Sequence, residues 1–144
     1  VLTGGGQSVG ALRVNDLPGP TTLLLPALLW HRNPCGEPSF TTTVGFANPG
    51  IEAVTVTLYL PKESKRAIRI NNKAVALPHQ LVIEAGRWKQ VAVQPMARPF
   101  EGCFEPESFD LEVVIDGPLV VYGSVVDGRS MDSRMVVPVD LQQN

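Results

Sequence analysis

The segment Gly6-Gln7-Ser8-Val9-Gly10 has the G-x-S-x-G spacing of a nucleophile elbow. In such an elbow a serine sits on a tight turn between a strand and a helix. Here the segment belongs to a glycine-rich stretch, and no helical pattern follows it. The two histidines, His31 and His79, have no carboxylate or second histidine at a spacing that would orient a general base. We therefore expect no catalytic residue and interpret both histidines as loop residues.

An acidic run with no basic residue between its members occupies part of the C-terminal half. Its members are Glu101, Glu105, Glu107, Asp110, Glu112 and Asp116. Calcium needs several oxygen ligands that converge, and Glu105, Glu107 and Asp110 would converge if their loop folded back. The loop with Asp127 and Asp132 is a second candidate, although no D-x-D-x-D-G motif is present. We expect no metal site or other cofactor and interpret the run as a solvated face.

A basic segment lies near the middle of the chain, with Glu63 as its single acid. Its members are Lys62, Lys65, Arg66, Arg69 and Lys73. It lacks interleaved aromatic residues and the chain has a net charge of −2, so we expect no nucleic-acid partner. The segment either prevents edge-to-edge strand pairing at a solvated hairpin tip or docks an acidic protein or anionic headgroups. If it docks, it would orient the partner together with Glu101, Glu105 and Glu107.

The two cysteines, Cys35 and Cys103, both lie in turn-rich segments between expected strands. A disulfide between them would close a loop of 68 positions. In the chain-entropy model it would stabilise the fold by about 4 kcal/mol. Paired loop cysteines fit an oxidising compartment. The alternative is two free thiols, and no Cys/His spacing indicates zinc.

Trp30 and Trp88 admit two interpretations. Exposed aromatic rings act as platforms in sugar-binding sandwiches, because their faces pack against the apolar surfaces of sugar rings. Aromatic residues are only 6% of this chain, so we interpret both tryptophans as residues at the rim of the core. A carbohydrate-binding module remains the alternative, and it requires one of them to be exposed on a flat face.

The composition is that of a globular protein. The 144 residues are 44% hydrophobic and 18% charged, which predicts a single domain with its own core. The longest aliphatic stretch, Leu23–Trp30, has eight residues and contains Pro26. It is far shorter than the roughly 20 residues of a membrane span. The chain begins at Val1 and not at Met, so we expect either a processed mature protein or a piece cut from a longer chain, and processing would agree with export.

The elements that must position these residues are all strands. We expect a flexible leader over residues 1–20, with a possible short edge strand at Leu12–Val14, and one domain over residues 21–144. Short runs with apolar alternation and no helical period predict the strands. They are Thr21–Trp30, Phe40–Ala47, Val54–Leu60, Arg66–Ile70, Gln80–Glu84, Arg87–Val93, Phe109–Ile115, Leu119–Val126 and Met135–Val139. Eight or nine strands at this spacing predict a single antiparallel immunoglobulin-like β-sandwich.

Local signals add detail to this pattern. Pro26 should force a bulge or an edge position in its strand. Leu119–Val126 is apolar on both faces, so it should be a central strand. Turns at Ala85-Gly86, Asp116-Gly117-Pro118 and Asp127-Gly128 each predict a hairpin between the strands that flank them.

Part of the chain resembles a recurrent immunoglobulin-like β-sandwich module of bacterial secreted and surface proteins. The resemblance rests on the Phe40–Gly50 strand ending in Asn-Pro-Gly, the alternating Ala53–Leu58 strand, and the Val121–Gly128 strand with its Val-Val-Asp turn. Leu25-Pro26-Ala27 and Val137-Pro138 match its entry and closing segments. The resemblance covers Leu23 to Val139 and implies the fold and an appendage of exported proteins without defined activity.

Cys35, Cys103 and the basic insert around Lys62–Lys73 depart from that module. Taken together, the sequence predicts a non-enzymatic structural or protein-interaction module that is periplasmic or extracellular. We expect an accessory subunit of a larger exported or membrane-surface assembly, with peripheral membrane contact or a glycan as further possible partners.

Overall fold

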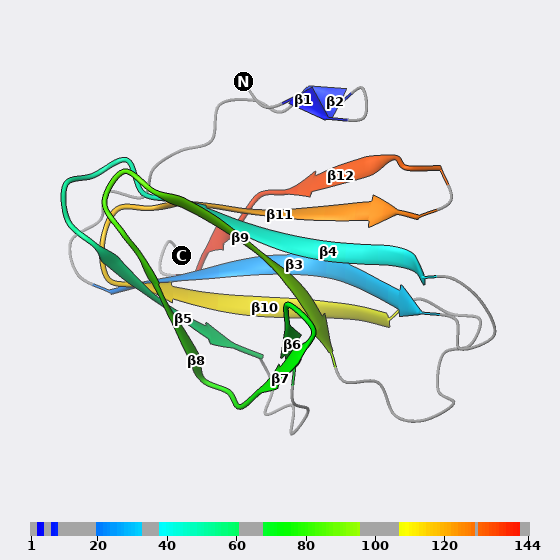
Figure 1. The fold of residues 1–144 in the computed structure, drawn as a ribbon, viewed down its shortest axis with the longest axis horizontal. Coiled ribbons are helices and arrows are strands. Elements are labelled where there is room, and N and C mark those ends of the chain that lie inside the picture. Colours follow the sequence, from blue (N-terminus) through cyan, green and yellow to red (C-terminus); the bar gives the residue numbers. More distant parts are fainter. Residues whose placement is uncertain are drawn as a thin grey trace.

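The computed structural model describes residues 3–4, 7–8, 20–32, 38–60, 68–95, 107–128 and 130–141. All regular structure in these residues is β (Figure 1). The strands are β1 (Thr3–Gly4), β2 (Gln7–Ser8), β3 (Thr21–Arg32), β4 (Pro38–Ala47), β5 (Val54–Tyr59), β6 (Ile68–Ile70), β7 (Lys73–Val75), β8 (His79–Ile83), β9 (Trp88–Pro95), β10 (Glu107–Ile115), β11 (Val120–Asp127), β12 (Ser133–Val136) and β13 (Val139–Asp140).

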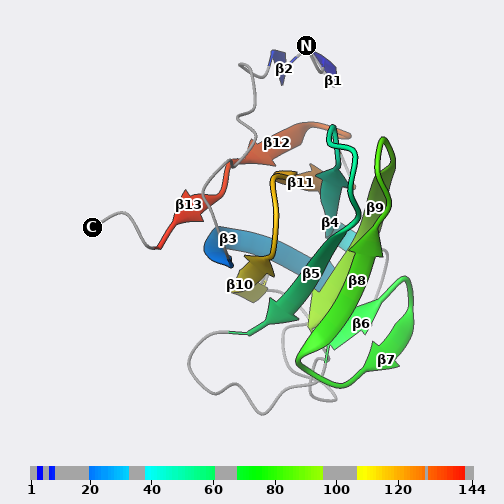
Figure 2. The ribbon, with the colours of Figure 1, turned by 90° about the vertical axis from the view of Figure 1, so that its left-hand side faces the viewer.

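The long strands form two antiparallel sheets of five and six strands. The first sheet has the order β13-β3-β10-β5-β8, and the second has the order β12-β11-β4-β9-β6-β7. From the side, β3 and β10 lie in one layer and β4 and β9 in the other (Figure 2). The expected all-β sandwich is confirmed. The expected strand number was too low, because β7 was missed and Met135–Val139 divides between β12 and β13.

Two strand crossings join the sheets. The last residues of β3, His31 and Arg32, leave the first sheet and pair with Phe40 and Pro38 of β4. The C-terminal segment passes from β12 in the second sheet to β13, which pairs with β3 in the first. Each crossing ties one layer to the other through the backbone.

The core lies between the layers and follows from strand alternation. In β5, Val54, Val56 and Leu58 are buried while Thr55 and Thr57 face outward, as the sequence predicts. The same rule buries alternate residues of the facing strands, because successive side chains of a strand point to opposite faces. They include Val44, Phe46, Val91, Val93, Leu111, Val113, Ile115, Val121 and Val125.

Pro26 produces a bulge, as expected. Leu25 is opposite Leu111 and Leu28 is opposite Phe109, so β3 carries one more residue than β10 at this point. The extra residue brings Ala27 to a φ of 56°. Because the bulge takes Ala27 out of the hydrogen-bonded ladder, its polar backbone groups need other partners.

Two of the three expected hairpins are wrong. β8 and β9 flank the turn at Ala85-Gly86, but β8 pairs with β5 and β9 pairs with β4 and β6. β10 and β11 flank Asp116-Gly117-Pro118, and they also belong to opposite sheets. In both cases the two strands bury their apolar faces against the same core from opposite sides. The third turn, Asp127-Gly128, joins β11 and β12 as a true hairpin.

Asn48 fixes the turn after β4. Its side chain is 2% exposed, and its Nδ2 donates to the carbonyl oxygens of Glu52 (2.7 Å) and Ile83 (2.9 Å). The backbone N–H of Gly50 donates to Asn48 Oδ1 (2.9 Å). One buried amide therefore connects the Asn-Pro-Gly turn to the end of β8.

The N-terminal segment is described only at two short strands. Thr3 pairs with Ser8 and Gly4 with Gln7. Of the G-x-S-x-G motif, Gln7 and Ser8 are described and form β2, while the expected edge strand Leu12–Val14 lies outside the described residues.

Candidate functional site

Three strands of the second sheet bring Tyr122, Gly45 and Gln90 into one row. Tyr122 of β11 and Gln90 of β9 are both directly opposite Gly45 of β4. Tyr122 lies on the outer face of the sheet, yet it is only 7% exposed. Its ring covers Gly45, since a Cβ atom at that position would come within 2.1 Å of Tyr122 Cζ. The glycine is needed here for the close approach of the ring to the backbone.

Trp88 lies in the next row, opposite Ala47 of β4, and contacts Tyr122 from there. Its indole Nε1 donates to Tyr122 Oη at 2.9 Å, and 59% of the Trp88 residue surface is exposed. The interpretation of Trp88 as a core-rim residue is therefore wrong. It shares its face of β9 with exposed Gln90 and Ala92, opposite buried Val91 and Val93, and this alternation was readable in the sequence. Trp30 lies in β3, where it pairs with Glu107.

Polar groups without charge lie beside the indole. Gln90 Nε2 donates to Thr43 Oγ1 at 2.9 Å, and both residues point outward from their strands. We call the surface made of Thr43, Gly45, Trp88, Gln90 and Tyr122 the Trp88 face. It offers an aromatic plane with an amide and a hydroxyl next to it.

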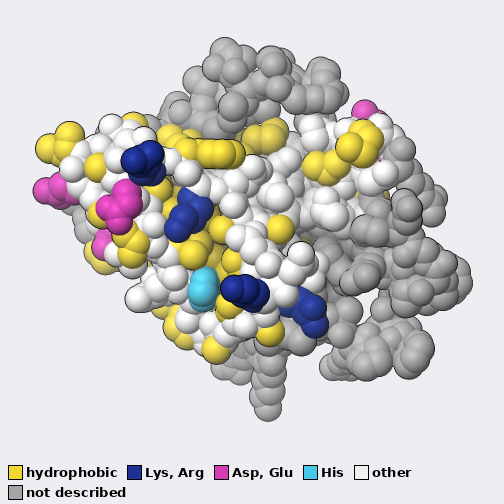
Figure 3. Space-filling model, in the orientation of Figure 1, with side chains coloured by type: hydrophobic (Ala, Val, Ile, Leu, Met, Phe, Trp, Pro, Cys, Tyr) yellow, Lys and Arg dark blue, Asp and Glu magenta, His cyan; other side chains and the backbone are white. Residues whose placement is uncertain are grey.

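Exposed basic residues lie in or next to β6, β7 and β9 of the second sheet. Arg69 of β6 is opposite Gln94 of β9, and Lys73 begins β7. Arg87 and Lys89 flank Trp88 in the chain, and all four residues are exposed. Lys89 points to the other face of β9, because successive strand residues alternate, and its Nζ donates to the carbonyl oxygen of Val82 in β8 at 3.5 Å. Figure 3 shows Lys and Arg side chains in a diagonal row that passes beside a His side chain, with Asp and Glu side chains near one end of the row. Of the predicted docking residues, Arg69 lies on the same outer face of the second sheet as Trp88 and Lys73 pairs with Ile70 at the edge of that sheet, while Lys62, Lys65 and Arg66 lie outside the described residues.

Two members of the acidic run bind the backbone. Asp110 Oδ1 accepts a hydrogen bond from the N–H of Ala27 in the bulge (2.8 Å), and Asp116 Oδ1 accepts one from the N–H of Thr55 (2.8 Å). Asp110 therefore stabilises the bulge in β3, and Asp116 stabilises the end of the β5–β10 pairing, roles that the interpretation as a solvated face missed. Glu107 begins β10, whereas Glu101 and Glu105 lie outside the described residues.

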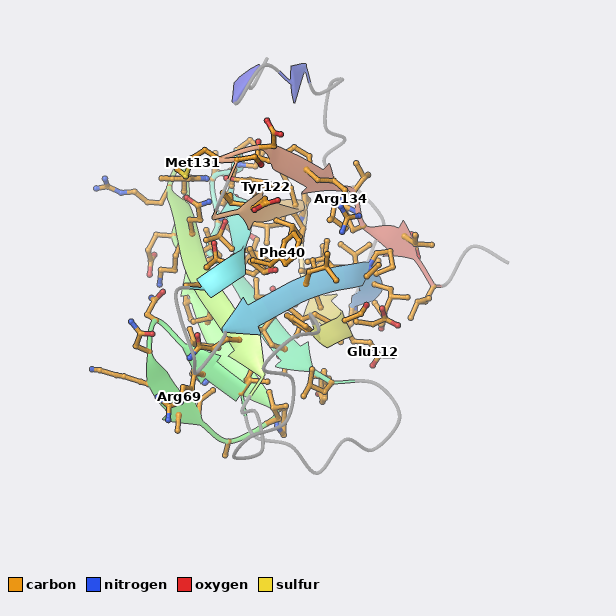
Figure 4. The ribbon with its side chains drawn as sticks, turned by 90° about the vertical axis from the view of Figure 1, so that its right-hand side faces the viewer. Phe40, Arg69, Glu112, Tyr122, Met131 and Arg134 are labelled. Carbon is orange, nitrogen blue, oxygen red and sulfur yellow. The ribbon has the colours of Figure 1, made fainter. Side chains whose placement is uncertain are left out.

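The outer face of the first sheet carries a different surface. Val139, Leu24, Glu112 and Tyr59 form one row across β13, β3, β10 and β5. Val139 is 51% exposed, Tyr59 37%, and Val82 of β8 46%. We call the surface made of Leu24, Tyr59, Val82, Glu112, Val114 and Val139 the Glu112 face. Glu112 and Arg69 lie on opposite sides of the sandwich (Figure 4).

The histidines occupy strands instead of the expected loops. His31 pairs with Phe40, because β3 extends further than predicted to reach β4. His79 is half-buried in β8 and pairs with Leu58. Within the described residues, no group of three or more His, Cys, Asp or Glu side chains could hold a metal ion. Cys35 and Cys103 both fall outside the described residues, so their pairing stays a prediction.

Comparisons with known proteins place the chain in no family. No family model matches it, and no curated protein matches it. The crystal structure of Thermotoga maritima 1070 is similar to it with a TM-score of 0.45 and 13% identity, covering 86% of this chain and 94% of that chain. In the part of the chain that the structure describes, no helix is long and apolar enough to cross a membrane.

Proposed function

We propose that the chain is a non-enzymatic, immunoglobulin-like interaction module of an exported protein assembly, in which it is an accessory subunit. The Glu112 face carries this proposal. It places Val139, Tyr59 and Val82, each more than a third exposed, on the outer surface of one sheet. Exposed apolar side chains that share one surface favour contact with another protein.

Glu112 gives the Glu112 face its specificity. It stands between Leu24 and Tyr59 in the row, so a partner that covers this row also covers the carboxylate. A buried carboxylate is costly unless a cation or hydrogen-bond donor pairs with it. The partner should therefore present an apolar surface with one Lys or Arg at its centre.

The exported location and the immunoglobulin-like topology are part of the same proposal. They are supported by the resemblance of the Phe40–Gly50 and Val121–Gly128 segments to modules of bacterial secreted proteins. We also propose that charged residues orient the partner. They are Lys62, Lys65, Arg66, Glu101, Glu105 and Glu107. Charge reversal at Lys65 and Arg66 should weaken a specific complex, and unchanged binding would contradict the charge-docking part.

Native mass spectrometry of protein purified from its source under mild detergent tests the proposal. We expect a complex of fixed stoichiometry that Glu112→Lys weakens, because the variant places a cation against the partner's cation. Glu84→Lys is the matched control, since it makes the same charge change at an exposed turn outside the Glu112 face. A chain that emerges alone, or a complex that both variants weaken equally, would contradict the proposal.

A further inference from the structure

The indole of Trp88 is exposed but held in place. Its N–H is bound to Tyr122 Oη, and Tyr122 in turn is fixed by packing over Gly45. A ring whose orientation is set before binding loses little conformational entropy when a ligand stacks on it. Since the polar edge of the indole is already satisfied, its remaining exposed surface is the apolar face, which suits the apolar face of a sugar ring.

Gln90 and Thr43 supply groups that match sugar hydroxyls. They are hydrogen-bonded to each other, but the Gln90 carbonyl oxygen and the Thr43 hydroxyl proton remain able to bind a ligand. Gln90 is two residues from Trp88 on the same face of β9. An aromatic plane with neutral donors and acceptors beside it distinguishes this surface from the Glu112 face, which is mainly aliphatic.

Basic residues on this sheet indicate that the ligand is negatively charged. Arg87 directly precedes Trp88 in the chain, and Arg69 lies opposite Gln94, six residues beyond Trp88 along β9. At about 3.3 Å per residue, Gln94 lies roughly 20 Å from Trp88 along the strand. Basic side chains along such a length attract an extended polyanion, and Arg pairs well with carboxylates in a two-pronged geometry.

We propose that the Trp88 face binds an acidic polysaccharide, with a sugar ring stacked on Trp88 and ring carboxylates paired with Arg69 and Arg87. A nucleic acid fits less well, because the face has a single exposed aromatic ring, and successive bases need several stacking platforms. The site is on the opposite side of the sandwich from the Glu112 face, so polysaccharide binding can be tested independently of the protein partner.

Isothermal titration with oligogalacturonate tests the site. We expect Trp88→Ala to weaken binding by about tenfold or more, equivalent to roughly 1.4 kcal/mol. Trp88→Phe, which keeps an aromatic plane, should bind within a few-fold of the unmodified protein. Val82→Ala is the matched control on the other face and should bind normally. Because Trp88 is exposed, these variants should fold, and thermal melts of each variant verify this.

The charge requirement has its own ligand control. Methyl-esterified oligogalacturonate has the same rings without the carboxylate charges, and we expect it to bind about tenfold more weakly or worse. Arg69→Gln combined with Arg87→Gln should remove most of this difference. The proposal is overturned if the ester binds equally well, if Trp88→Ala has no effect, or if a single-stranded oligonucleotide binds more tightly.

Discussion

Arg134 of β12 donates a hydrogen bond from its guanidinium to the carbonyl oxygen of Ala27 in β3, at 2.8 Å. The two residues belong to different sheets, and the bond spans the side of the sandwich where β12, β13 and β3 lie (Figure 4). Asp110 accepts the bond from the N–H of the same residue. A bulge imposed by Pro26 is thereby held on both of its polar backbone groups by charged side chains.

Removing the Asp110 side chain should destabilise the bulge. Asp110→Ala leaves the Ala27 N–H without its carboxylate acceptor and should lower the free energy of unfolding by about 1 kcal/mol, because the site is exposed and water replaces part of the bond. Asp110→Asn keeps an acceptor oxygen and should cost less. Urea denaturation checks both variants, and equal losses would show that the hydrogen bond is not the cause.

An acidic side chain in place of Asn48 should destabilise the fold. Asn48→Asp faces a carboxylate towards the carbonyl oxygens of Glu52 and Ile83, so it should cost more than Asn48→Ala, whose loss we expect to be about 2 kcal/mol. Asn71→Asp is the matched control. Asn71 Oδ1 accepts a hydrogen bond from the N–H of Ala92, and an aspartate keeps this role. Denaturant melts in which both Asp variants lose the same stability would contradict this explanation.

Gly45 should be intolerant of even a methyl group. Gly45→Ala forces the Tyr122 ring aside and should cost about 1–3 kcal/mol, the range for overpacking. The Trp88 hydrogen bond to Tyr122 would be lost at the same time, which a change in Trp88 fluorescence reports. In the Tyr122→Ala background the same substitution should cost much less. A loss of similar size in both backgrounds would rule out the ring as the cause.

Thr42 and Thr41 differ in burial although they are neighbours. Thr42 is 2% exposed and its Oγ1 donates to the carbonyl oxygen of Leu29 at 2.5 Å, which connects β4 to β3. Thr42→Val should cost about 1–2 kcal/mol, because the partly buried carbonyl oxygen of Leu29 loses this donor. Thr41→Val on the exposed face should be close to neutral. Chemical denaturation gives the free energy of unfolding of both variants. A decrease for Thr41→Val as large as for Thr42→Val would refute the role of the Thr42 hydrogen bond.

The expected disulfide has a direct test. If Cys35 and Cys103 are bridged, reduction should lower the free energy of unfolding by about 4 kcal/mol in the chain-entropy model, and the intact mass should rise by two hydrogens. Cys35→Ser and Cys103→Ser should each reproduce the loss without reductant. Free thiols in the unreduced protein, detected by alkylation, would show that the alternative is correct.

Strand positions could be predicted from the sequence because alternation is a local property. The alternation of Val54, Val56 and Leu58 indicates the buried face of β5 within six residues. The bulge at Pro26 follows from a single residue that lacks a backbone N–H. The central position of β11 also followed from its apolar residues and is confirmed by its pairing with both β4 and β12.

Which strands pair could not be predicted in the same way. Asp116-Gly117 and Asp127-Gly128 are the same dipeptide, yet the first leads across the core and the second forms a hairpin. The difference depends on which neighbours complete the core, and those come from distant parts of the chain. The exposure of Trp88 could have been predicted from the alternation in β9, but its contact with Tyr122 could not, since Tyr122 meets Gly45 only when β11 pairs with β4.

The passage of β3 from one sheet to the other has a consequence for how the domain loses its structure. Thr21–Trp30 pairs within the first sheet and His31–Arg32 within the second, so neither layer can unfold while the other keeps all of its strands. On the other side, β12 and β13 link the layers again. The domain should therefore unfold in a single all-or-none transition, with equal calorimetric and van't Hoff enthalpies.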